Sequence, residues 1–83
     1  MQRQSEDNYR NILDQVNSRL EALDRIEEKL LQLRELASYA ASRHLNEKEA
    51  NEVQEWVDIL TAEIKELDES TAVRSPLLRN LYY

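Results

Sequence analysis

The residues of this chain that could do chemistry are its carboxylates and its single histidine. Glu63 and Glu66 are spaced to share a helix face, where two carboxylates could act as general acid and general base. Both residues are expected at exposed helical positions, and nothing in the sequence around them indicates a pocket, so that acid–base catalysis is not expected. His44, near Glu47 and Glu49, could ligate a metal, but one histidine without cysteine is a weak ligand set, and a histidine favoured by a helix C-terminus is the better interpretation. We therefore expect no enzyme activity, no cofactor and no metal.

The composition indicates a small, all-α protein. The chain has 83 residues with no glycine, no cysteine and one proline. Such a chain forms one small domain over residues 1–83, and the absence of glycine excludes a glycine-rich phosphate loop. A formal net charge of −6 argues against nucleic acid and anionic membranes as partners. No apolar run approaches 18 residues, and the polar start MQRQSEDNYR does not resemble a secretory signal.

The clearest helix signal lies in the second half of the chain. Apolar residues follow one another at alternating spacings of three and four, which places them on one stripe of a helix. They are Ala50, Val53, Val57, Leu60, Ile64 and Leu67. Asn46 is a favoured N-cap, and Glu49 can reach back to it in a capping box. We predict a helix over 47–69 after a turn at 44–46, with His44 or Asn46 in the left-handed conformation because glycine is absent.

A longer helix is predicted before that turn, over residues 5–43, with Ser5 as its N-cap. Its apolar positions also alternate by three and four, except for two successive spacings of three that rotate the stripe near Leu23. They are Tyr9, Leu13, Val16, Leu20, Leu23, Ile26, Leu30, Leu33, Ala37 and Ala40. The fold prediction is an antiparallel, coiled-coil-like two-helix hairpin with an extended tail over 70–83.

The two predicted helices differ in length, which leaves part of the first one uncovered. At 1.5 Å per residue the first is roughly 58 Å long and the second roughly 35 Å. We expect the second helix to cover only the half from Ile26 to Ala40. The uncovered apolar positions are Tyr9, Leu13, Val16 and Leu20. A second chain could cover them, giving a homodimer or higher oligomer in a helical bundle, or the tail could run back along them. We favour the second chain.

Trp56 and Ile59 form a second candidate interaction patch. They are i,i+3 neighbours and lie beside the apolar stripe of the second helix. Tail residues such as Leu78 or Tyr82 could cover this patch within one chain, or a partner protein could bind there, since tryptophan is enriched at binding hot spots. The second helix carries nine acids against two lysines. Its acidic face is either solvated or directed towards a basic partner.

The segment from Leu33 to Ile64 resembles the central helical hairpin of bacterial flagellins and hook–filament junction proteins. The run LRELASYAA matches that family's L-R-E-L-A-x-x-A-A pattern. The run VQEWVDILTAEI follows its I-Q-x-E-[IV]-D-x-L-x-x-E-I pattern except at Val53 and Trp56. The similarity covers about half of the chain. The family's Asn-Gly turns and long terminal helices have no counterpart here, and Trp56 and Ile59 stand where the family usually has polar residues.

This resemblance implies a shared hairpin fold, a structural role and no catalysis. It also implies an intersubunit polar contact for Arg34 and Glu35, although we favour a solvated pair. Two functions are therefore expected from the sequence. One is a self-assembling structural protein, exported to a flagellar structure if the resemblance holds. The other is a small cytoplasmic adaptor, chaperone or regulator, for example of prophage origin, that binds a partner protein through exposed apolar positions.

Overall fold

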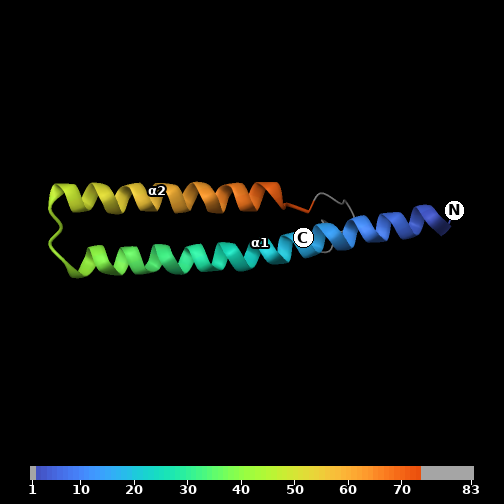
Figure 1. Ribbon diagram of the computed structural model, residues 1–83. Helices are drawn as coiled ribbons and strands as arrows, with labels where there is room; N and C mark the ends of the chain where they lie inside the picture. Colours follow the sequence, from blue (N-terminus) through green and yellow to red (C-terminus); the bar gives the residue numbers. More distant parts are fainter. Residues whose placement is uncertain (1, 74–83) are drawn as a thin grey trace.

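The protein is an antiparallel two-helix hairpin (Figure 1). The computed structural model describes residues 2–73, and it describes side chains from residue 6 onwards. Helix α1 spans Gln2–Ser42 and helix α2 spans Glu47–Ser70. The molecule measures 65 × 19 × 16 Å, so that α1 alone sets its length. The predicted all-α hairpin is confirmed.

The N-terminus of α1 differs from the prediction. The helix begins at Gln2, which places Ser5 inside the helix rather than at its N-cap. Ser5 is a favourable cap, but the preceding residues Gln2, Arg3 and Gln4 are good helix formers, and nothing in them breaks the pattern. The start of a helix is therefore not fixed by a capping residue alone.

Asn46 sets the turn between the helices. Its backbone is extended, at φ −74° and ψ 172°, and its side-chain Oδ1 accepts a hydrogen bond of 2.8 Å from the backbone N–H of Glu49. Its carbonyl accepts the first helical bond, from the N–H of Ala50 at 2.9 Å. Among the described residues none has a positive φ, so the left-handed residue expected at His44 or Asn46 is absent. The chain reverses direction over residues 43–46, which lie between the two helices, and Asn46 itself is extended.

This cap gives a first prediction. Replacing Asn46 by Ala should lower the free energy of unfolding by about 1 kcal/mol, because the N-terminal N–H groups of α2 lose their acceptor. Urea denaturation followed by circular dichroism measures the change. Asn51→Ala is the matched control, since Asn51 lies inside α2 and alanine is the better helix former there. Equal losses in both variants would show that the cap contributes nothing specific.

The C-terminus of α2 is satisfied from the other helix. Arg19 pairs with the Asp68 carboxylate at 2.7 Å and donates to the Asp68 carbonyl at 3.1 Å. It also donates to the Thr71 hydroxyl at 3.3 Å, and that hydroxyl donates to the Leu67 carbonyl at 2.6 Å. The last turn of α2 contains no basic residue. Arg19 therefore supplies both the donors and the positive charge that a helix C-terminus favours.

These contacts also correct the predicted extent of α2. The second helix was expected to reach only as far as Ile26 on the first, whereas its end meets Arg19 two turns further on. The reason is that antiparallel helices advance at equal rates, so the 24 residues of α2 cover an equal number of residues of α1. The part of α1 beyond the end of α2 is accordingly residues 2–18, about 25 Å of helix.

The face that α1 turns to α2 also differs from the predicted stripe. Leu33 and Ala40 are half-buried as expected, but Leu30 and Ala37 are exposed, and Lys29 and Leu36 are half-buried in their place. The seam follows one uninterrupted heptad pattern in which two positions carry Arg19 and Lys29. A pattern restricted to apolar residues passes over these cations. Their aliphatic stems can nevertheless lie along apolar surface while the charged groups reach water.

Lys29 shows why such a residue is tolerated in the seam. Its Nζ pairs with the Glu63 carboxylate at 2.6 Å, across the helix interface and partly in solvent. A pair of this kind contributes about 0.2–1 kcal/mol. Its main role is to select the register of the two helices, because Lys29 lies opposite Glu63 only in this register.

Replacing Lys29 by Leu should therefore stabilise the hairpin. Filling a seam position with leucine buries more apolar surface than the lysine stem does, which should outweigh the lost pair and give a net gain of about 1 kcal/mol. Lys65→Leu is the control, because Lys65 lies on the exposed side of α2 and should change stability by less than about 0.5 kcal/mol. Thermal unfolding of both variants measures the difference. A loss of stability in the Lys29 variant would mean that the ion pair outweighs burial.

The core of this hairpin is very small. Within the described part of the chain only Ala22 and Leu60 are buried, at 3% and 5% exposure. Two helices touch along a single line, so each seam residue is covered on one side and open on the other. Large apolar side chains consequently remain on the surface, and they form the candidate functional surfaces.

Candidate protein-interaction surfaces

The first surface is an apolar stripe along α1, which we call the α1 stripe. It continues the spacings of three and four on the flank of the seam, one residue, or about 100°, around the helix from the seam positions. Its exposed members are Tyr9, Leu13, Leu20, Leu23 and Leu30. Tyr9 is 70% exposed, and Val16, which lies between Leu13 and Leu20 in the same spacing, is half-buried.

The stripe crosses the end of α2, so part of it lies on the free N-terminal segment and part beside the hairpin. Figure 1 shows α1 continuing past the end of α2. The sequence placed Leu30 in the seam and assigned Leu23 neither to the seam nor to the uncovered positions, whereas the structure exposes both. The candidate surface is therefore longer than the four residues predicted from helix lengths.

The second surface is a shallow groove of about 470 Å³ between the two helices, which we call the Trp56 groove. Its floor is Leu36 and Leu60, and its walls include Tyr39 from α1 and Trp56 from α2. Gln32 and Glu35 complete the lining. Trp56 is 57% exposed, and Ile59 is exposed one turn further along α2. Of the two residues predicted as a patch, Trp56 thus lines a groove that contains a second aromatic side chain, and Ile59 lies just outside the lining.

Arg34 lies beside this groove on the outer side of α1. It is exposed and lines a neighbouring hollow of about 600 Å³ with Leu31, Glu35, Ser38, Tyr39 and Ser42. Tyr39 and Glu35 belong to both depressions. The guanidinium of Arg43 stacks over the Tyr39 ring at 4.7 Å, a cation–π contact that orients this ring at the turn end of the groove.

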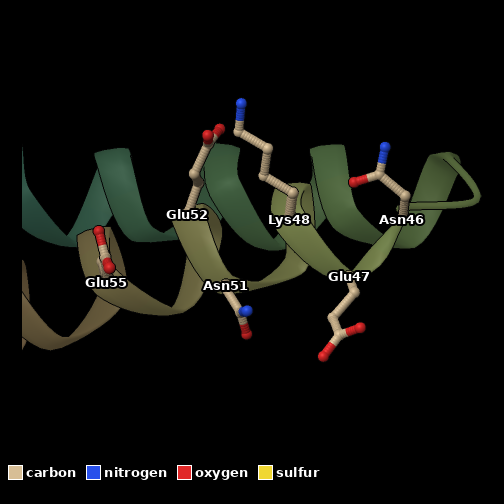
Figure 2. Close-up of a pocket in the computed structure, with 6 residues that line it drawn as sticks. All are labelled: Asn46, Glu47, Lys48, Asn51, Glu52 and Glu55. Carbon is tan, nitrogen blue, oxygen red and sulfur yellow. The ribbon is translucent and has the colours of Figure 1, made fainter.

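The residues considered for chemistry are not brought together. Glu63 is paired with Lys29, and the described residues contain no group of three or more metal-ligating side chains. A third hollow, of about 700 Å³, lies at the start of α2. Figure 2 shows its lining side chains pointing in different directions: Lys48 and Glu52 to one side, Glu47 and Asn51 to the other. This hollow has no convergent set of polar groups.

Sequence reasoning missed Tyr39 as a surface residue and Arg19 and Lys29 as seam residues. The signal that could have found the two cations was the strict heptad through Ile12, Ala22, Leu33 and Ala40, with acids at the facing end of α2. The tail positions Leu78 and Tyr82, predicted as possible covers of the Trp56 patch, lie outside the described residues.

Comparisons with known proteins identify no relative. No protein-family model, no curated protein and no solved structure matches the chain. The resemblance to flagellins therefore stays a prediction. Neither helix of the described part is both long enough and apolar enough to cross a membrane.

Proposed function

We propose that this chain is a non-catalytic, self-assembling helical protein whose copies join through the α1 stripe. The observation that carries the proposal is the row of large exposed side chains at Tyr9, Leu13, Leu20, Leu23 and Leu30. Contiguous apolar surface of this kind marks interaction sites in soluble proteins. A second copy supplies a surface of matching size and spacing, as a two-fold interface requires.

The small core of the hairpin supports the same proposal. A two-helix hairpin in which two of the described residues are buried gains little from burial, and small domains of this kind commonly depend on oligomerisation. Pairing two hairpins along their α1 stripes gives a four-helix core that covers the free segment of each α1. The flagellin-like runs on α1 and α2 are consistent with a structural role, and in that family the hairpin belongs to a self-assembling protein.

Measurement of molecular mass over a range of concentrations tests this proposal. Sedimentation equilibrium at high micromolar concentration should give at least twice the chain mass of 9.8 kDa. Dilution should lower the mass and the helical circular dichroism together, because folding and association are linked. A monomer at high micromolar concentration, with full helicity, would overturn the proposal.

A second candidate function is an adaptor that binds another protein at the Trp56 groove. The observation in its favour is the exposure of Trp56 beside Tyr39 and Ile59, away from the α1 stripe. Tryptophan and tyrosine are the residues most enriched at the centres of protein interfaces. The two functions use different faces of the hairpin, so that one does not exclude the other.

A further inference from the structure

We infer that the Trp56 groove is a docking site for a basic amphipathic helix of another protein. The inference rests on the second candidate function, the adaptor, and adds the chemistry of its partner. It does not depend on self-assembly through the α1 stripe. Three properties of the groove carry it: its shape, its apolar floor and the charge around it.

The shape is that of a seat for a third helix. A hairpin leaves an open groove on each side of its seam, and a helix packed there contacts both α1 and α2. In the Trp56 groove such a helix would cover the Leu36 and Leu60 side chains and insert between Tyr39 and Trp56. Helix-in-groove binding uses anchors spaced at i, i+3, i+4 and i+7 on the incoming helix. The partner is therefore amphipathic.

The charge around the groove determines whether the partner helix is basic or acidic. Glu35 lines the groove. Glu52 and Glu66 lie outside its lining, two helical turns before and after Ile59 on the same side of α2. None of these three carboxylates takes part in an ion pair of the described residues, which are those of Arg19, Lys29 and Lys65.

The cations near the groove do not cancel this negative charge. Lys29 is already paired with Glu63, and Arg43 is stacked on the Tyr39 ring. Arg34 lines the neighbouring hollow on the outer side of α1 and not the groove itself. Lys48, which projects beside Glu52 in Figure 2, is the nearby base on α2. The helix as a whole has nine acids and two lysines, a net charge of −7. A second copy of this acidic chain would bring like charges to the same rim, whereas Lys and Arg flanking an apolar stripe would complement it.

A peptide titration tests the inference on the full chain. The probe is a peptide of about 18 residues, five helical turns, built only from Leu at i, i+3, i+4 and i+7 spacing and Lys elsewhere. Two matched peptides carry Gln or Glu in place of every Lys. Trp56 is the chain's single tryptophan, so its emission reports on the groove alone. The Leu/Lys peptide should shift this emission to the blue in a saturable manner, more weakly at high salt, and the other two peptides should bind at least about tenfold more weakly.

Two variants of the chain separate docking in the groove from general attraction to an acidic surface. Ile59 does not line the groove, but it lies one helical turn from Trp56 on α2, where a helix seated in the groove would cover it. Ile59→Ser removes this apolar residue without changing the charge, and should weaken binding about tenfold. Leu31→Ser is the matched control, because Leu31 is 52% exposed against 48% for Ile59 but lies on α1, in the neighbouring hollow with Arg34 and Ser38. It should alter binding by less than about twofold.

The possible results test the basic partner, the adaptor function and self-assembly separately. If the Gln or Glu peptide binds as tightly as the Leu/Lys peptide, the basic partner is wrong while the adaptor function stands. If no peptide shifts Trp56, or if both variants weaken binding equally, the docking site and the adaptor function both fall. Self-assembly is judged separately, from the mass of the chain without peptide.

Discussion

Replacing Leu13 and Leu20 together by Glu is expected to convert the protein into a monomer with much reduced helicity. The two residues lie seven positions apart on the α1 stripe, and both are exposed in the single chain. Burying a carboxylate in an apolar interface costs several kcal/mol, which exceeds what two neighbouring leucines contribute to association. Because Ala22 and Leu60 are the only buried residues in the described part of the chain, loss of association should also loosen the fold.

The measurement is sedimentation equilibrium combined with circular dichroism at the same concentrations. The control is the double variant Leu31→Glu with Ser38→Glu, which adds the same two charges to exposed positions seven residues apart on another face of α1. It should keep the mass and helicity of the unmodified protein. If both double variants dissociate, net charge rather than the α1 stripe governs assembly. If neither does, another surface joins the chains.

The fold could be predicted from the sequence because both of its determinants are local. Asn46 marks the start of α2 through a hydrogen bond to the backbone N–H three residues away. The apolar stripe through Val53 and Leu60 is a spacing within one helix. Neither feature depends on the other helix. The order and direction of the two helices followed directly.

The register between the helices could not be predicted in the same way, because it depends on contacts across the seam. Apolar spacing alone placed Leu30 in the seam, and the structure places Lys29 there because Glu63 lies opposite. The same holds at Arg19, whose role as a cap for α2 exists only once both helices are paired. The observed seam therefore differs from the predicted one by a rotation of α1 of one residue, and this difference exposes Leu30 and makes the α1 stripe longer.

The candidate surfaces also divide into a feature of one helix, which the sequence predicts, and a feature of two helices, which it does not. Trp56 and Ile59 could be predicted as exposed neighbours from their position beside the stripe of α2. The groove that Trp56 lines needed Tyr39 and Leu36 from the other helix, and the register determines which residues of α1 face Trp56. A surface made by one helix is visible in the sequence, whereas a surface shared by two helices requires the structure.

Leu60 is where a single substitution should destabilise the hairpin most. It is 5% exposed, packs in the seam and forms part of the floor of the Trp56 groove. Replacing it by Ala removes buried methyl groups and leaves a cavity, a change that costs about 2–5 kcal/mol in protein cores. A domain of this size has little stability to lose. We therefore expect the variant to be largely unfolded near 25 °C even if the loss is only about 2 kcal/mol.

Urea denaturation followed by circular dichroism measures this loss, and Leu31→Ala is the control. The same side chain is truncated to alanine in both variants, but Leu31 is about half exposed, so its truncation should cost less than about 0.5 kcal/mol. The comparison tests the register, because rotating α2 away from the described seam would expose Leu60. Similar, small losses in the two variants would mean that Leu60 is not buried between the helices, and the Trp56 groove would then lose its floor.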